Sequence, residues 1–255
     1  MQNDRLLFLI KYLLSENPRY GSIEIPHSPD ERFNLYRSLV NVRPAGGAKK
    51  EFLDTEDDFL RETAKEKGIV DISELTSRDK NIYLWQGDIT RLKCGAIVNA
   101  ANSGMTGCYQ PCHGCIDNCI HTYAGTRLRH KCGIIMQNQG HPEPTGKAKI
   151  TPAYNLPCDY VIHTVGPIVQ GRLTEEHCRL LDSCYVSCLE AAPQNGIDSI
   201  AFCCISTGVF GFPQREAAEI AVSAVRRFQR EHNIKVIFNV FKDEDFEIYD
   251  SLLNR

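Results

Sequence analysis

The stretch Ala96-Ile97-Val98-Asn99-Ala100-Ala101-Asn102-Ser103-Gly104 opens with a short apolar run and ends in two asparagines among small residues. An apolar run of this kind, closed by turn-forming residues, predicts a buried strand. The two asparagines would then stand at the carboxyl end of the strand, where open α/β sheets bind their ligands. A turn built from asparagine and glycine explains the same letters equally well.

Short apolar runs alternate with helical stretches from about Asn81 onward. Such alternation predicts an α/β layer fold. We expect strands at Ile82–Trp85, Ala96–Asn99, Tyr160–Thr164, Ser199–Ile205 and Lys235–Val240. We expect helices at Asp117–Lys131, Glu175–Ala192, Gln214–His232 and Asp245–Leu253.

The N-terminal part of the chain instead has a helical pattern. Apolar residues recur at helical spacing from Leu6 to Leu14. Ser28-Pro29-Asp30-Glu31 predicts a second helix, with an N-cap, a proline at the first helical position and a capping-box glutamate. A third helix is expected over Glu56–Lys67, begun by Thr55 and ended by Gly68. We therefore predict a helical lobe over residues 1–75 and an α/β catalytic domain over residues 76–255.

Composition narrows the classes of function. The 255 residues carry 29 Lys and Arg against 32 Asp and Glu, so no general positive field favours a nucleic acid. The apolar run Leu6–Leu14 is too short to span a bilayer, and no signal-peptide cleavage site follows it. We expect a cytoplasmic protein with neither membrane nor nucleic acid as partner. In that compartment the 12 cysteines favour metal or redox chemistry over disulfides.

Two further polar motifs follow predicted strands. In Gly87-Asp88-Ile89-Thr90 the carboxylate could accept a hydrogen bond from an adenine amino group, cap a helix or close a turn. The run Ile205–Pro213 lies between a strand and a helix, and its glycines let backbone N–H groups approach an anion such as a diphosphate. Each motif alone is a weak signal. Three in order, each at a strand end, favour a ligand cleft.

Together with the segment 147–167, these motifs resemble the macrodomain family over roughly residues 81–253. The resemblance implies an ADP-ribose cleft on a mixed sheet flanked by helices. By position, Asp88 and Ile89 would meet adenine, Phe241 would stack on it, and Asn102 would contact the distal ribose. The expected ADP-ribose-binding set is completed by Asn99, Ser206, Thr207, Gly208, Val209 and Phe210.

The segment from Gly107 to Asn118 departs from the glycine-rich loop of ordinary macrodomains. Cys108, His113 and Cys115 place thiol, imidazole and thiol groups at positions i, i+5 and i+7. Soft thiolates with an imidazole match Zn²⁺ better than a hard cation, so we predict one zinc ion per chain. Three protein ligands leave a coordination position open for catalysis, whereas Cys112 could complete a closed structural site. The spacing leaves both alternatives open.

The cysteine-containing loop is similar to that of a zinc-containing macrodomain subclass, which also carries an N-terminal helical extension. This resemblance implies a hydrolase that removes mono-ADP-ribose from acidic side chains, in some cases on lipoyl-carrier proteins, and reverses sirtuin-type ADP-ribosylation. Asn102 and Asp117 are then the expected catalytic residues. Asp117 would orient the attacking water or accept its proton, or it would have only a structural role as the N-cap or dipole partner of the following helix. His121, on the same helix face, is expected to support the site or to pack.

Two other functions fit the same residues. A non-hydrolytic ADP-ribose reader would use the same cleft, with a zinc that only braces the loop. A zinc-stapled nucleic-acid module is disfavoured by the charge balance and by the lack of a basic face with interleaved aromatic residues.

Overall fold

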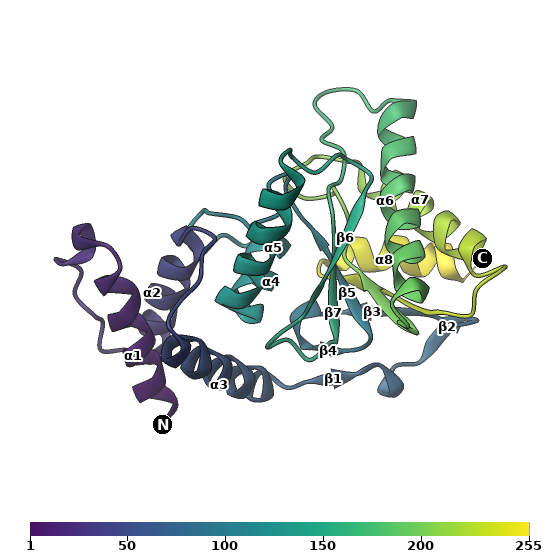
Figure 1. The fold of residues 1–255 in the computed structure, drawn as a ribbon. Coiled ribbons are helices and arrows are strands. Elements are labelled where there is room, and N and C mark those ends of the chain that lie inside the picture. Colours follow the sequence, from purple (N-terminus) through teal and green to yellow (C-terminus); the bar gives the residue numbers. More distant parts are fainter. Residues whose placement is uncertain (255) are drawn as a thin grey trace.

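A mixed seven-stranded sheet lies between two layers of helices in the computed structural model, which describes residues 1–254 (Figure 1). In spatial order the strands are β2 (Ser77–Asp79), β3 (Ile82–Gln86), β9 (Lys235–Val240), β8 (Ser199–Phe202), β5 (Ala96–Ala100), β7 (Tyr160–Thr164) and β6 (Ala148–Pro152). The inner strands are parallel, and both edge strands are antiparallel to their neighbours. The predicted fold class is confirmed.

The inner strands form because their apolar residues are covered on both faces. Nearly every side chain of β5, β8 and β9 is buried, as expected for parallel strands that have helices on both sides. Because these strands run in one direction, the segments that follow β3, β5, β8 and β9 all leave the sheet at the same edge. The predicted motifs therefore meet there.

Helices cover both faces of the sheet. Those described are α4 (Ile116–Ala124), α5 (Thr126–Gln139), α6 (Glu175–Gln194), α7 (Gln214–Phe228) and α8 (Asp243–Leu253). Figure 1 shows α4 and α5 on one side of the sheet and α6, α7 and α8 on the other. The two-residue strands β1 (Val70–Asp71) and β4 (Leu92–Lys93) form a separate small pair.

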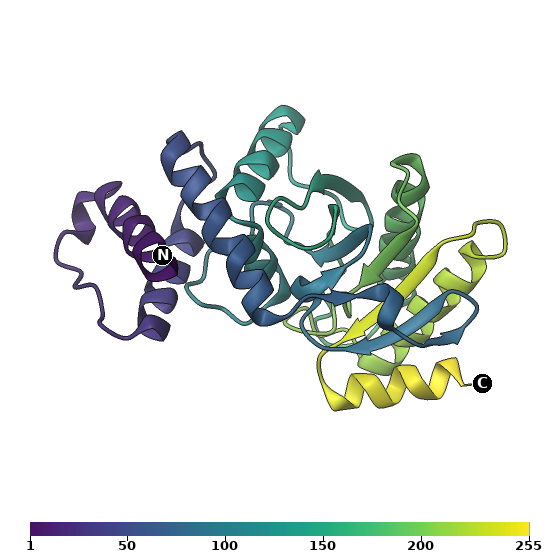
Figure 2. The same cartoon turned by 90° about the horizontal axis from the view of Figure 1, so that it is seen from below.

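The N-terminal lobe is a three-helix unit beside α4 and α5 (Figure 2). It consists of α1 (Gln2–Ser15), α2 (Pro29–Val42) and α3 (Lys50–Lys67). Its core is separate from that of the sheet and includes Leu9, Ile10, Tyr36, Phe52 and Leu60. The division of the chain at residue 75 stays a prediction. None of the helices in residues 1–254 is both long and apolar enough to span a membrane.

A buried carboxylate joins the lobe to the sheet domain. Glu56 of α3 accepts hydrogen bonds from Tyr36 Oη at 2.8 Å and from the backbone N–H of Thr126 at 2.8 Å. The hydroxyl of Thr126 donates to the same carboxylate at 2.9 Å. Burial raises the pKa of Glu56, and these donors satisfy both of its oxygens, so the lobe is docked by buried polar contacts as well as by packing.

The single helix predicted over Asp117–Lys131 is wrong. Gly125 ends α4 with φ +90° and ψ 179°, and α5 begins at the next residue. A Cβ at Gly125 would lie 2.9 Å from Leu60 Cδ1 and 3.0 Å from Glu56 Oε2. Only glycine therefore fits at the break between α4 and α5, because the lobe approaches it closely.

Several predicted boundaries are also wrong. Helix α3 begins at Lys50, so Thr55 lies inside it and donates to the carbonyl of Glu51. Ser28 precedes α2 and Pro29 holds its first position, but the Ser28 side chain makes no capping hydrogen bond. Strand β8 and helix α7 end earlier than predicted, at Phe202 and Phe228. The edge strands β2 and β6 were missed because they are exposed or only half-buried.

Candidate active site and metal centre

Asp117 lies in the first turn of α4 with a largely buried side chain, 5% exposed. Its Oδ1 accepts from Asn99 Nδ2 at 2.8 Å, and its Oδ2 accepts from Asn102 Nδ2 at 3.1 Å. The interpretation as an N-cap is wrong, because Cys115 holds that position and its Sγ accepts from the backbone N–H of Asn118. Burial raises the pKa of Asp117 to about 6, against the lowering effect of the two amides and Arg129.

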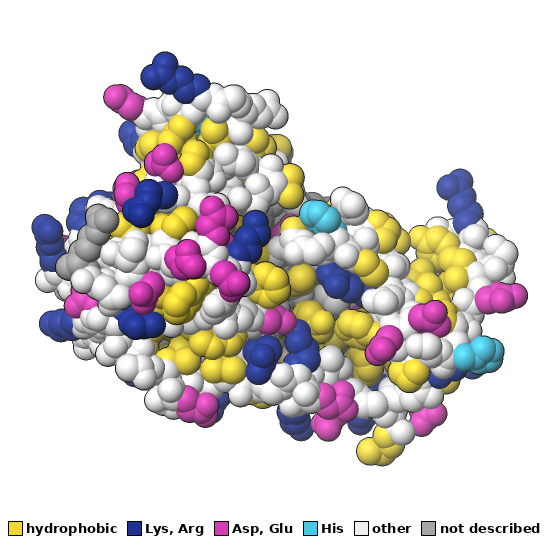
Figure 3. All heavy atoms as spheres, turned by 180° about the vertical axis from the view of Figure 1, so that it is seen from behind, with side chains coloured by type: hydrophobic (Ala, Val, Ile, Leu, Met, Phe, Trp, Pro, Cys, Tyr) yellow, Lys and Arg dark blue, Asp and Glu magenta, His cyan; other side chains and the backbone are white. Residues whose placement is uncertain are grey.

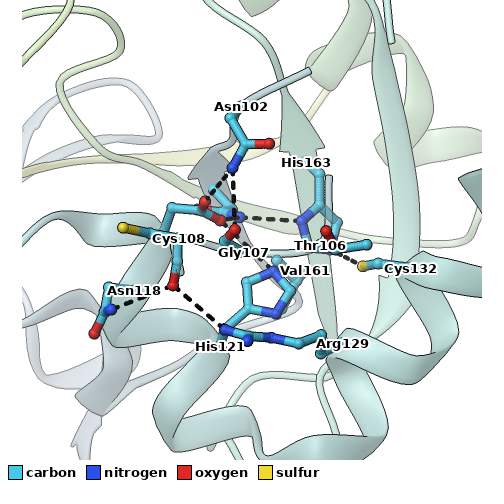
Figure 4. Close-up of polar contacts among 12 residues, drawn as sticks. Asn102, Thr106, Gly107, Cys108, Asn118, His121, Arg129, Cys132, Val161 and His163 are labelled. Atoms are coloured by element: carbon cyan, nitrogen blue, oxygen red, sulfur yellow. Dashed lines mark hydrogen bonds and ion pairs between the residues drawn. The ribbon is translucent and has the colours of Figure 1, made fainter. Parts of the chain in front are cut away.

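Asn102 lies between this carboxylate and the cysteine-containing loop. Besides Asp117, its amide nitrogen donates to the carbonyl of Gly107 at 3.1 Å, as Figure 4 shows. Its Oδ1 accepts from the backbone N–H of Gly104 at 2.9 Å. The structure thus brings the two predicted catalytic residues into direct contact.

Asn99 supports Asp117 from inside the sheet. It lies opposite His163 in the β5–β7 register and is completely buried. Its amide nitrogen contacts His163 Nδ1 at 3.1 Å as well as Asp117. An amide nitrogen can only donate, so Nδ1 accepts and the ring proton lies on Nε2, 3.0 Å from Thr151 Oγ1. Direct contact between Asn99 and ADP-ribose stays a prediction.

His163 was not identified from the sequence as a site residue. Its signal was an imidazole within the mostly apolar strand β7. Together with His121 and Cys132 it forms a buried group whose ligand atoms lie within 4.8 Å of one another. His121 Nε2 is 3.6 Å from Asp117 Oδ1. Burial lowers the pKa of both imidazoles, that of His163 to about 3. Two neutral rings therefore lie beneath Asp117.

The three predicted metal ligands converge. The donor atoms of Cys108, His113 and Cys115 all lie within 4.8 Å of one another, and Cys108 Sγ is 3.6 Å from His113 Nδ1. Zinc–sulfur bonds of about 2.3 Å and zinc–nitrogen bonds of about 2.0–2.1 Å, arranged tetrahedrally, place such donors roughly 3.6 Å apart. The donor set and its spacing fit a zinc ion.

Cys112 points away from this group. Its Sγ lies 3.2 Å from Ser38 Oγ and 3.4 Å from the carbonyl of Asn34, both on α2. Its backbone N–H donates to Asn41 Oδ1 at 2.9 Å, and its φ is +52°. The geometry therefore favours the three-ligand alternative over the closed site in which Cys112 is the fourth ligand.

The predicted adenine residues occupy a turn after β3. Asp88 Oδ1 accepts from the backbone N–H and the hydroxyl of Thr90, at 3.0 and 2.6 Å. Its Oδ2 pairs with Lys67 Nζ at 2.6 Å, so the lobe also touches this end of the site. Asp88 is therefore the N-cap of the short 3₁₀ helix Ile89–Arg91, one of the two structural roles expected for it. The side chain of Ile89 is buried, which leaves only its backbone to meet a base.

Phe241 follows β9 directly and is 76% exposed. Its neighbour Val240 is buried in the core. A large aromatic ring that is left in solvent at a strand end has a free face on which a base could stack.

The predicted diphosphate loop turns sharply at both ends. Ser206 has φ +67°, and Gly211 has φ +69°. Between them the backbone reaches the surface, where Val209 is 81% exposed. Phe210 accepts a hydrogen bond from the backbone N–H of Val169 at 2.8 Å. Gly208 is also exposed and Thr207 is half-buried, and the loop leads to α7, whose N-terminus favours an anion.

Close packing fixes the start of this loop. A Cβ at Gly166 would lie 2.0 Å from Ser206 Oγ, so only glycine fits beneath it. Within residues 1–254 that buried hydroxyl has no hydrogen-bond partner. A buried polar atom normally has a partner, so this hydroxyl is available to hydrogen-bond with a ligand that binds in the loop.

Comparison with known proteins places this geometry in context. Residues 98–221 match the model of the Macro domain family. The chain is 56% identical to a protein-ADP-ribose hydrolase from Treponema medium, over 99% of each chain, and 47% identical to one from Staphylococcus aureus (strain MRSA252), over 98% of this chain and 96% of that one. A Trypanosoma brucei macrodomain solved in complex with ADP-ribose is 30% identical, with a TM-score of 0.65, over 89% of this chain and 97% of that one.

Proposed function

Because the chain belongs to the macrodomain family, we propose that it is a zinc-dependent hydrolase that removes single ADP-ribose units from acidic side chains of modified proteins. Relatives that match nearly the whole chain are named protein-ADP-ribose hydrolases. The observation that carries the proposal is the direct contact of Asn102 with both Asp117 and the loop that bears the three metal ligands.

In this proposal, binding and chemistry are divided between two parts of the ligand site. Asp88 and Phe241, at the ends of β3 and β9, would hold adenine, and the loop 206–210 would hold the diphosphate. The distal ribose would then reach Asn102, and its bond to the acceptor would face Asp117 and the cysteine-containing loop. In this arrangement contacts far from the reacting bond supply affinity and place that bond for attack.

The chain's own residues provide a proton acceptor and its support. The buried carboxylate of Asp117 would take a proton from the attacking water. Asn99 and Asn102 fix its two oxygens. A zinc ion held by Cys108, His113 and Cys115 would lower the pKa of bound water towards about 7 and polarise a reacting oxygen. Water adds across the cleaved bond, and the products are free ADP-ribose and the restored carboxylic acid side chain.

The biological setting of this proposal rests on the resemblance to the zinc-containing subclass. We extend it to reversal of sirtuin-type ADP-ribosylation, with lipoyl-carrier proteins among the acceptors. We place the reaction in the cytoplasm, because thiolate ligands need reduced cysteines.

The reader alternative shares every nucleotide contact, but it has no turnover and its zinc only braces the loop. The nucleic-acid alternative gains no support from the face shown in Figure 3. On this face, Lys and Arg side chains are interspersed with Asp and Glu.

Release of ADP-ribose from defined substrates tests the proposal. The zinc-loaded protein should release ADP-ribose from a protein modified on glutamate or aspartate. It should release much less from a matched protein modified on serine or arginine. Tight binding of ADP-ribose without release from any of these substrates would support the reader instead.

A further inference from the structure

The N-terminal lobe contacts the ligand loop through one cationic side chain. Arg37 lies on α2, and its Nη2 donates to the backbone carbonyl of His113 at 2.7 Å. The same nitrogen donates to Asn118 Oδ1 at 2.9 Å, and Nε approaches that oxygen at 3.3 Å. Hydrogen bonds from an ionised donor are among the stronger ones in proteins. Arg37 therefore binds the backbone of His113, one of the predicted metal ligands.

Asn118 passes this contact on to the rest of the loop. Its side chain is completely buried, and its Nδ2 donates to the carbonyls of Gln110 at 2.9 Å and Cys108 at 3.4 Å. Its backbone N–H donates to Cys115 Sγ at 3.4 Å. Arg37 is thus connected to His113 directly and to Cys108 and Cys115 through Asn118.

A second set of contacts from α2 keeps the loop in this shape. Asn41 accepts from the backbone N–H of Cys112 and donates to Thr122 Oγ1 at 3.0 Å. It holds Cys112 in a left-handed conformation that non-glycine residues adopt at some cost. The loop is therefore fitted to the surface of α2, and its shape depends on that helix.

We propose that Arg37 is a positioning residue of the metal site, so that the N-terminal lobe and the sheet domain build the site together. This inference rests on the proposed function only in that the loop binds zinc. Groups that orient metal ligands typically contribute about 10–100-fold to metal affinity. Without Arg37, the carbonyl of His113 and Oδ1 of Asn118 lose their shared donor, and the loop can move its ligands apart.

Zinc release from the full-length, zinc-loaded protein tests this role. The measurement is the rate of zinc transfer to a chromogenic chelator, paired with ADP-ribose affinity by calorimetry and a circular-dichroism check of the fold. Arg37→Ala should release zinc about 10–100-fold faster, with ADP-ribose affinity within about twofold of the wild type. Arg37→Lys keeps the charge but loses the planar guanidinium, so its rate of zinc release should lie between those of Arg37→Ala and the wild type.

The matched control lies on the same helix. Arg32 donates hydrogen bonds to the carbonyl of Pro26 at 2.6 Å and to Asn3 Oδ1 at 2.7 Å, and both partners are in the lobe. Arg32→Ala should release zinc at the wild-type rate.

Two results would overturn the assignment. One is wild-type zinc release from Arg37→Ala. The other is joint loss of zinc and ADP-ribose binding in both Arg37 variants, which would make Arg37 a residue of the general fold. Failure of the proposed function looks different, because a wild-type protein that binds no zinc is recognised before any variant is made.

Discussion

Asn102 donates its side-chain amide to Oδ2 of Asp117 at 3.1 Å, while Oδ1 of the same carboxylate is held by Asn99 at 2.8 Å. The carboxylate therefore has a fixed orientation although it is buried. Because Asn102 also binds the carbonyl of Gly107, it links this carboxylate to the beginning of the metal loop. Its loss should disturb the reacting centre more than the nucleotide subsites.

Asn102→Ala should lower single-turnover release of ADP-ribose by about 100-fold, since small displacements of reacting groups have effects of that order. Affinity for free ADP-ribose should change only a few-fold, because the adenine and diphosphate contacts remain. Asn195→Ala is a suitable control, since that exposed asparagine donates only to the nearby carbonyl of Ala191. If affinity falls as much as turnover, Asn102 serves binding rather than catalysis.

Phe241→Ala should weaken ADP-ribose binding by about 1–3 kcal/mol, the usual contribution of aromatic stacking on a base. Phe241→Tyr should bind like the wild type, because the ring face is retained. The 76% exposure of Phe241 means that truncation should hardly affect the free energy of unfolding. If calorimetry finds that Phe241→Ala binds ADP-ribose as tightly as the wild type, adenine does not stack on Phe241.

Single substitutions should separate the metal ligands from Cys112. Cys108→Ala, His113→Ala and Cys115→Ala should each reduce zinc content after dialysis, because each removes one of three protein ligands. Cys112→Ala should keep zinc near the wild-type level, since its thiol faces Ser38 and Asn34. Elemental analysis is the measurement. Zinc loss in the Cys112 variant would point to a closed, structural site.

Acid should destabilise the fold partly through His163. Its pKa of about 3 lies below the ordinary value of 6.5 because burial disfavours the charged ring. Between these pH values the unfolded chain binds one more proton, so the free energy of unfolding falls as pH decreases, by about 1.4 kcal/mol per pH unit from this group. Protonation would also make Nδ1 a donor, and it would then face the amide nitrogen of Asn99, which is a donor too.

His163→Gln tests that contribution. It should be less stable at pH 7, by about 1–3 kcal/mol, because it disturbs two buried hydrogen bonds. Its stability should, however, decline less steeply between pH 6 and pH 4 than that of the wild type. Denaturant unfolding of metal-free protein provides both values. Parallel declines would assign the acid sensitivity to other groups.

Much of this site follows from local sequence. Each strand-end motif contains its own chemistry, and parallel strands bring such motifs to one edge, so their meeting could be predicted from the order of elements. The spacing of Cys108, His113 and Cys115 likewise matched a convergent donor set.

The remaining features depend on contacts between distant segments. Gly125 breaks the helix where α3 presses against it, and Arg37 reaches the loop from α2 across 76 positions of sequence. The sequence around Gly125 or Arg37 does not indicate which distant segment each residue contacts. The orientation of Cys112 has the same origin, because Ser38 and Asn41 determine it.

The central claim is that zinc acts in the chemical step, and one paired measurement on the same preparation tests it. ADP-ribose release from a carboxylate-modified protein and equilibrium affinity for free ADP-ribose are measured before and after zinc is removed with a chelator. Circular dichroism then checks that the metal-free protein is folded. The account predicts that release is abolished while most of the affinity remains, and that added zinc restores release. Undiminished release from folded, metal-free protein would contradict it.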